Sequence, residues 1–315
     1  MVALFLFVIA TVIGLVLFDQ YVHENVYRAQ SRIYVEDEGL VERTYINTSI
    51  FSVLGFNRDE IRTFSAFRDH FRNYAEVSSA MRKTGMELVR LMVGIDFSAS
   101  NEWQGRRTFK GECLHALKGS SVYNPYQKVI YILGHALQPL LQGYPIAAFG
   151  FSDMKARDRD VFPLKESGAP CVDFVDLLEC YTFAARRVQL SGPTCFDPII
   201  RRAMKMVEKS KTFHVLLIIT DGQLRQDDKR SRQALIDASH VPLSIITIGV
   251  GDGPWLVMED WDDHLSERCF DNFQFVSFHH VIRSARNPEA ALALHALMEI
   301  PDQYQTMIDL GYISS

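Results

Sequence analysis

Short apolar runs alternate with amphipathic stretches after Gly85, and this alternation limits the possible folds more than any other feature. Each apolar run is too short for a typical helix and is bounded by Gly, Pro, Asp or Ser. The predicted strands are Leu88–Ile95, Pro145–Phe151, Phe213–Thr220, Leu243–Val250 and Phe273–Phe278. The predicted helices are Pro125–Leu141, Val172–Val188, Pro198–Lys209, Asp228–Ala238 and Pro288–Glu299. This pattern predicts an α/β fold, a doubly wound and mostly parallel sheet with helices on both faces.

A hydrophobic segment, Met1–Phe18, precedes this domain and contains no charged or strongly polar side chain. As a helix it would span about 27 Å, close to the ~30 Å of a bilayer's hydrocarbon core. It lacks the basic start and the small-residue cleavage site of a signal peptide. We therefore predict a membrane-anchor helix at residues 1–18, with a signal peptide or a buried helix as the alternatives.

The cellular compartment of the domain depends on whether this helix is a membrane anchor, a signal peptide or neither. Arg28 and Arg32 come after the apolar segment, which favours a membrane-anchored chain whose domain faces the cytoplasm. The chain would be cytoplasmic if the helix is not an anchor, and it would enter the secretory pathway if the helix is a signal peptide. The glycosylation sequon at Asn47 would matter only in a lumenal chain.

Residues 19–84 are predicted to form a linker that contains an amphipathic helix. Phe64, Phe67 and Phe71 have helical spacing within Phe56–Tyr74, which indicates a stripe that packs on the following domain. A helix that binds a partner is the alternative. The following domain is predicted to span residues 85–311.

Charge and cysteine content exclude several classes of protein. The formal net charge of -5 argues against a nucleic-acid binder, which would carry surplus Lys and Arg. The five cysteines are odd in number and scattered, without a CxxC pair, at Cys113, Cys171, Cys180, Cys195 and Cys269. This pattern argues against a disulfide framework and against a Cys-rich zinc module.

Polar side chains follow two predicted strands at their carboxyl ends, where ligands bind in sheets of this kind. Asp96, Ser98 and Ser100 follow the first strand, Asp221 follows the third, and Thr194 precedes a helix. Together they offer only oxygen ligands, which suit Mg²⁺. Because most of these ligands are neutral, a bound ion would stay electrophilic and could accept a partner's carboxylate. The alternative is that these residues cap helices and turns.

The order D-x-S-x-S, Thr and T-D-G resembles the metal-ion-dependent adhesion site (MIDAS) of von Willebrand factor A (vWA) domains. Longer stretches resemble the copine-type A domain, namely Gly94–Asn101, Asn124–Gln127, Ala148–Phe151, Gly192–Thr194, His214–Gly222 and Pro242–Ile245. Other stretches resemble most the copine-like domain of plant RING-domain ubiquitin ligases, namely Ser100–Trp103, Gly249–Trp255, Phe270–Phe275 and Glu299–Tyr304. The resemblance covers Gly85–Gly311.

This resemblance implies a metal-dependent protein-binding module, with a component of ubiquitin transfer that recruits substrates as the alternative. Mg²⁺, or Mn²⁺ or Ca²⁺, would be bound directly by Asp96, Ser98, Ser100 and Thr194. Asp221 would bind it directly or through a water, and an acidic residue of the partner would complete the shell. Copines also carry C2 domains, and the ligases carry a RING finger. The sequence shows neither, so we expect neither C2-mediated membrane binding nor ubiquitin-transfer activity.

Enzymatic motifs are missing from the sequence. A phosphatase that uses Asp96 would usually need a second acid where Ser98 stands. No G-x-S-x-G or G-x-x-x-x-G-K-[ST] run occurs, and Pro254 replaces the third glycine of a dinucleotide loop. We therefore expect no catalytic site. Arg106 and Arg107, next to the metal loop in sequence, are the first candidates for contacts with an acidic partner.

Overall fold

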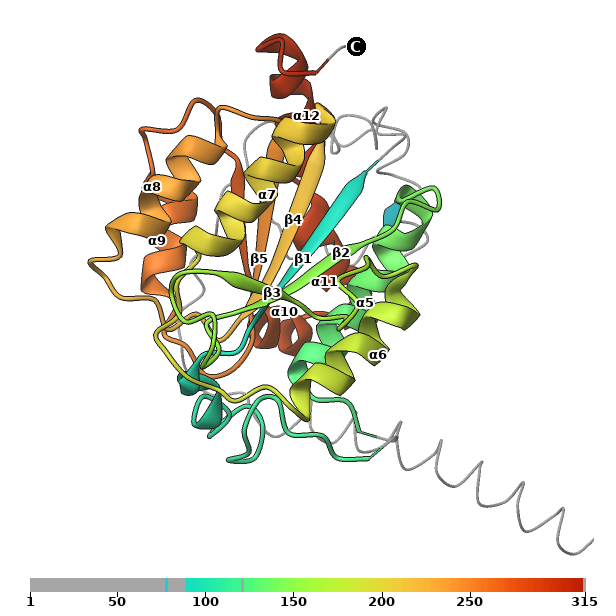
Figure 1. Ribbon diagram of the computed structural model, residues 1–315, viewed down its shortest axis with the longest axis vertical. Helices are drawn as coiled ribbons and strands as arrows, with labels where there is room; N and C mark the ends of the chain where they lie inside the picture. The colour runs from blue at the N-terminus through green and yellow to red at the C-terminus, as the bar shows by residue number, and fades with distance from the viewer. Residues whose placement is uncertain (1–76, 79–88, 120–121, 314–315) are drawn as a thin grey trace, which may run out of the picture. The chain divides into compact units, whose positions relative to one another are not determined.

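The computed structural model describes residues 77–78, 89–119 and 122–313, which include one six-stranded sheet with the order β3-β2-β1-β4-β5-β6 (Figure 1). The strands are β1 (Arg90–Asp96), β2 (Ala147–Phe151), β3 (Val161–Pro163), β4 (His214–Thr220), β5 (Leu243–Gly249) and β6 (Phe273–Ser277). All neighbours pair in parallel except β2 and β3. The prediction of a mostly parallel α/β sheet is confirmed, and the five predicted strands are present. The short edge strand β3 was not predicted.

Helices connect the strands and lie on both faces of the sheet (Figure 1). They are η1 (Ala99–Glu102), α5 (Pro125–Leu137), η2 (Gln138–Leu140), α6 (Phe174–Ala185), α7 (Asp197–Ser210), α8 (Lys229–Ala238), α9 (Leu256–His264), α10 (Phe278–Ser284), α11 (Pro288–Leu297) and α12 (Ile300–Asp309). The five predicted helices correspond to α5 with η2, α6, α7, α8 and α11. Helices α9, α10 and α12 were not among the predicted helices.

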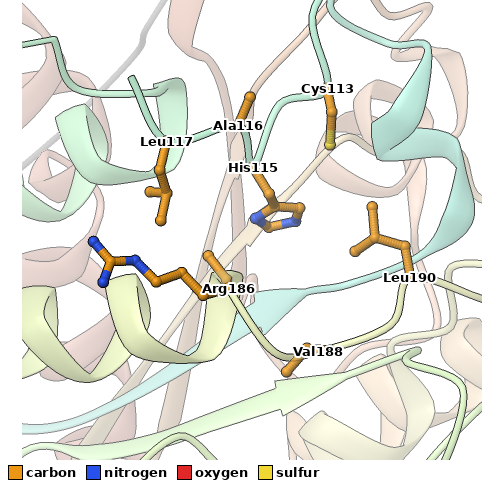
Figure 2. A pocket seen from close by; sticks show the side chains of 8 residues that line it. Cys113, His115, Ala116, Leu117, Arg186, Val188 and Leu190 are labelled. Carbon is orange, nitrogen blue, oxygen red and sulfur yellow. The ribbon is translucent and has the colours of Figure 1, made fainter. Parts of the chain in front are cut away.

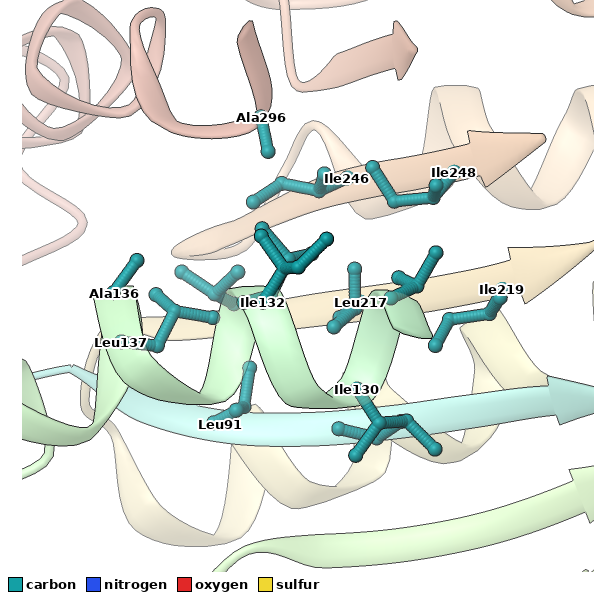
Figure 3. Close-up of a cluster of buried hydrophobic side chains, with 14 of the residues drawn as sticks. Leu91, Ile130, Ile132, Ala136, Leu137, Leu217, Ile219, Ile246, Ile248 and Ala296 are labelled. Atoms are coloured by element: carbon teal, nitrogen blue, oxygen red, sulfur yellow. The ribbon is translucent and has the colours of Figure 1, made fainter. Parts of the chain in front are cut away.

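The strands form two hydrophobic clusters because their side chains alternate between the two faces. On β4, Leu217 and Ile219 belong to the cluster under α5, α6 and α11, whereas Leu216 and Ile218 belong to the cluster under α7, α8 and α9. Figure 3 shows the first cluster, where Leu217 and Ile219 meet side chains from α5 and β5. Every residue of β4 is buried, which explains its continuous apolar sequence.

The predicted membrane helix at residues 1–18 and the linker helix at Phe56–Tyr74 lie outside the described residues. Of residues 19–84, only Val77 and Ser78 are described; both are helical and buried, and the Ser78 hydroxyl donates to the Ala136 carbonyl at 2.6 Å. Within the described part of the chain, no helix has the length and apolar character needed to cross a membrane.

Candidate metal centre

Asp96 ends β1, and the backbone then turns so that Ser98 and Ser100 come close to its carboxylate. The Ser98 amide donates to Asp96 Oδ1 at 2.8 Å, and the Ser98 and Ser100 hydroxyl oxygens lie 3.1 Å apart. Asp96 and Ser98 are fully buried, and Ser100 retains 9% of its exposure. The D-x-S-x-S pattern therefore gathers three oxygen-bearing side chains at the carboxyl end of the sheet.

Thr194 reaches the same place from a loop that runs beside the residues after β1. Ser98 and Ser191 form a parallel bridge, and the Ala99 amide donates to the Ser191 carbonyl at 3.1 Å. This pairing positions the Thr194 hydroxyl 3.0 Å from Ser98 Oγ and 3.4 Å from Asp96 Oδ2.

Asp221 joins the group because β4 is the parallel neighbour of β1. Ile95 is level with Ile219 in the ladder, so the residues that follow, Asp96 and Thr220, end at the same edge. The Thr220 hydroxyl donates to Asp96 Oδ2 at 2.6 Å. All five predicted site residues therefore lie together, and Thr220, which was not predicted to contribute, holds the central carboxylate.

The two carboxylates are buried without a compensating positive charge. No ion pair to Asp96 or Asp221 occurs in the described part of the chain. Burial raises the pKa of both carboxyls, and the neighbouring Asp96 charge raises the pKa of Asp221 further. The Ser100 and Thr194 hydroxyls are near enough to oppose this rise, yet Asp221 Oδ2 has no hydrogen-bond partner of ordinary geometry among the residues that the structure describes.

A buried polar network forms hydrogen bonds with the backbone carbonyl of Asp96. The Asp96 carbonyl accepts hydrogen bonds from His115 Nε2 at 2.9 Å and from the Tyr126 hydroxyl at 3.2 Å. His115 Nδ1 lies 2.9 Å from the Tyr181 hydroxyl, and the His115 ring stacks on Tyr126 with centroids 4.2 Å apart. These residues were not among the predicted site residues, because nothing in their sequence spacing indicates that they lie next to Asp96.

The sequence N-P-Y-Q at Asn124–Gln127 forms the start of α5. Asn124 caps α5 in a reciprocal pair with Gln127, and Pro125 takes the first helical position, where no amide hydrogen is needed. This start directs the Tyr126 hydroxyl to Asn101 Oδ1 at 2.7 Å, and Nδ2 of the Asn101 side chain donates to the Ser98 carbonyl at 3.1 Å. The cap therefore holds the turn after β1 in place.

The loop that follows the site is attached to the loop after β5. Asp252 accepts from the Arg107 and Thr108 amides, both at 2.9 Å, and from the Thr108 hydroxyl at 2.7 Å. The Arg107 side chain nevertheless stays 79% exposed. Trp103, in the same loop, is 46% exposed. A cationic and an aromatic side chain thus lie at the surface of this loop.

A pocket opens where the 113–117 loop meets the segment after α6 (Figure 2). Leu117, Val188 and Leu190 contribute apolar surface, and Arg186 is also part of the lining. His115 links the pocket to the network behind Asp96. None of the five predicted site residues lines it.

Comparison with known proteins shows the family of this chain. The family model described as Copine matches residues 113–315. The chain belongs to the copine family. It is 42% identical over 265 residues to the E3 ubiquitin-protein ligase RGLG4 of Arabidopsis thaliana, covering 79% of this chain and 65% of that protein. It is 43% identical over 240 residues to Copine family protein 1 of Caenorhabditis elegans, covering 75% of this chain and 22% of that protein.

The chain thus spans less than two thirds of the length of these two relatives. Among solved structures, a von Willebrand factor type A protein from Catenulispora acidiphila shares 13% identity at a TM-score of 0.38, covering 67% of this chain and 43% of that one. The predicted resemblance to copine-type vWA proteins and to ligases of the RGLG type is confirmed by the family model and these relatives.

Proposed function

We propose that this copine-family chain is a metal-ion-dependent protein-binding module. Asp96, Ser98, Ser100 and Thr194 would bind Mg²⁺ or a similar divalent ion directly, and Asp221 would bind it directly or through a water. The ion would supply positive charge that attracts an acidic side chain of the partner. Residues 1–18 would tether the module to a membrane, with the domain facing the cytoplasm.

The observation that carries this proposal is the pair of buried carboxylates, to which the described part of the chain offers no positive partner. Buried charges in proteins are normally paired or bound to a metal, because an isolated charge loses its hydration. Asp221 Oδ2 lacks any hydrogen-bond partner among the described residues, and such an atom costs about 1–3 kcal/mol when left unsatisfied. The surrounding hydroxyls are hard, neutral ligands, so the donor set fits Mg²⁺.

Calorimetric titration of the full chain with Mg²⁺ and Mn²⁺ tests the metal site. We expect binding to the wild type and none to Asp96→Ala, because the substitution removes the carboxylate that the other donors surround. Thr194→Val keeps the shape of the side chain and removes the hydroxyl, and should weaken binding about tenfold or more, a cost of ~1.4 kcal/mol.

Thr247→Val provides the matched control. Thr247 is also buried, and the same threonine-to-valine substitution removes its hydroxyl. It lies within β5, however, and this hydroxyl has no hydrogen-bond partner among the described residues. Its substitution should leave metal affinity unchanged. Identical titrations for wild type and Asp96→Ala would refute the site.

The partner is tested by proximity labelling in cells with the wild type and Asp96→Ala. Partners that bind through the metal should disappear from the Asp96→Ala sample and, in extracts, after addition of a chelator. Neighbours shared equally by both samples would contradict metal-dependent recognition.

The names of the relatives favour a second candidate, a role in ubiquitin transfer. Five relatives that are 39–42% identical are named E3 ubiquitin-protein ligases. In this case the domain would recruit substrates for ubiquitination. Recovery of a ubiquitin-conjugating enzyme or a RING protein with the chain would support this role, and their absence under chemical crosslinking would count against it.

A further inference from the structure

A second group of metal-ligand type lies outside the candidate metal centre. The sulfur atoms of Cys171 and Cys180 and a carboxylate oxygen of Asp176 all lie within 4.8 Å of one another. The sequence does not indicate this group through a CxxC motif, because Cys171 lies nine residues before Cys180. All five cysteines of the chain are free thiols, so neither of these two is committed to a disulfide.

The fold fixes the positions of all three side chains. Cys171 exchanges two backbone hydrogen bonds, of 2.7 and 2.8 Å, with Ile146, which is the residue immediately before β2. Asp176 and Cys180 lie four residues apart on α6, so they project from the same face of the helix. The N-cap Asp173 accepts from the Asp176 amide at 2.8 Å and fixes the start of this helix.

The Asp176 carboxylate is oriented so that one oxygen lies beside the Cys180 sulfur. Its Oδ2 atom accepts from Lys165 Nζ at 2.7 Å and from the Val172 amide at 2.9 Å. The other oxygen, Oδ1, is 3.5 Å from Cys180 Sγ. Outer partners that hold a ligand in this way are typical of metal sites, where they fix the direction of the ligating atom.

We propose that Cys171, Cys180 and Asp176 Oδ1 form a binding site for a thiophilic divalent cation of the Zn²⁺ type. Two sulfur atoms and one oxygen supply three ligands of a tetrahedral site, and water supplies the fourth. A surface depression that reaches Cys180 and Asp176, lined also by Glu166, Ser167 and Glu179, gives the ion a path from solvent.

Charge and ligand type both select this class of ion. On binding, the metal takes the place of the two thiol protons, which pass to the solvent. The two thiolates, together with the Asp176–Lys165 ion pair, then carry two net negative charges, which the divalent ion cancels. Sulfur ligands favour Zn²⁺ over Mg²⁺, whereas the all-oxygen group around Asp96 is of the type that suits Mg²⁺, Mn²⁺ or Ca²⁺. The two sites therefore differ in metal selectivity.

Titration of the reduced, metal-free full chain with Co²⁺, used as a spectroscopic probe for Zn²⁺, tests this proposal. We expect a thiolate-to-cobalt charge-transfer band in the near ultraviolet and the visible bands of a tetrahedral ion, both removed by added Zn²⁺. Cys171→Ser and Cys180→Ala should abolish the charge-transfer band or reduce it severely. Asp176→Asn, which keeps an acceptor for Lys165, should weaken the affinity by roughly tenfold or more.

Two controls separate this site from other thiols and from the candidate metal centre. Cys195→Ala removes a buried thiol elsewhere in the fold and should leave the band intact. Asp96→Ala should also leave it intact, so failure of the oxygen site and failure of the sulfur site give different results. A wild type without the band, or a band that survives in both Cys171→Ser and Cys180→Ala, would overturn the proposal.

A measurement on the wild type alone covers the case in which a variant fails to fold. Zn²⁺ should slow the alkylation of Cys171 and Cys180, read peptide by peptide by mass spectrometry, while the exposed Cys269 reacts at an unchanged rate. Equal alkylation of Cys171 and Cys180 with and without Zn²⁺ would also overturn the proposal.

Discussion

His115 shows how a single side chain can link the stability of the fold to the geometry of the site. Burial lowers the pKa of His115 to about 3, and the hydrogen bond to the Asp96 carbonyl opposes this shift only in part. A carbonyl can only accept, so Nε2 carries the proton of the neutral ring and Nδ1 accepts from the Tyr181 hydroxyl. The neutral ring therefore holds the backbone of the central ligand.

This shift predicts a dependence of stability on pH. Between about pH 6.5 and pH 3 the unfolded chain binds a proton at His115 that the native protein does not, so the contribution of His115 to the free energy of unfolding should decrease as pH falls through this window. The contribution of one such group is at most about 1.4 kcal/mol per pH unit. Urea unfolding with chelator present, at several pH values, measures it.

His115→Gln is the comparison that isolates this residue. It removes the titrating group, so its stability should fall less steeply with acid than that of the wild type. Asp96 and Asp221, whose raised pKa values act in the opposite direction, are present in both proteins and cancel in the difference. Parallel pH profiles for the two proteins would contradict this account.

At the scale of elements, the turn after β4 depends on the absence of a side chain at Gly222. This residue has a φ of +68°, and an added Cβ would lie 2.3 Å from Met258 Cε and 2.5 Å from Trp255 Cζ3. Gly222→Ala should therefore displace the turn that carries Asp221. We expect a loss of about 1–3 kcal/mol in the free energy of unfolding, as for other overpacked sites, together with weaker Mg²⁺ binding.

Gly143→Ala is the matched control for this turn. Gly143 has a φ of +81°, but an added Cβ there would meet nothing within 4 Å. Its substitution carries the backbone cost alone, so stability should fall less and Mg²⁺ affinity should stay at the wild-type value. Both quantities follow from chemical denaturation and calorimetry, and an equal loss of affinity in the two variants would argue against steric displacement of Asp221.

At the scale of the whole molecule, the proposed tether and the metal-binding domain should be separable. Deletion of residues 1–18 should move the chain from the membrane fraction to the soluble fraction, because the apolar segment that would enter the bilayer is lost. Metal binding should stay intact, because the site is built from residues 96–221. Sedimentation after cell lysis and calorimetry on the purified deletion variant measure both effects; continued sedimentation with membranes would disprove the anchor.

The fold could largely be predicted from sequence because parallel strands buried on both faces need continuous apolar runs. The run in β4 is the best example, since all seven of its residues are buried. The edge strand β3 has only three residues, half-exposed or exposed, and so carries no such signal. Helix α10 was missed for a similar reason, because it spans only seven residues and buries only Phe278 and Val281.

Five strands of the sheet and the oxygen-bearing residues at its carboxyl end could be predicted from local spacing, because spacing decides which residues follow a strand. Which distant groups meet at that end depends on the folded structure. Thr194 lies 98 residues from Asp96 and reaches it through the pairing of Ser191 with the turn after β1. Likewise, backbone pairing with Ile146 holds Cys171 near Cys180, which is carried by α6. Such contacts depend on strand register and helix packing, which act between segments far apart in the chain.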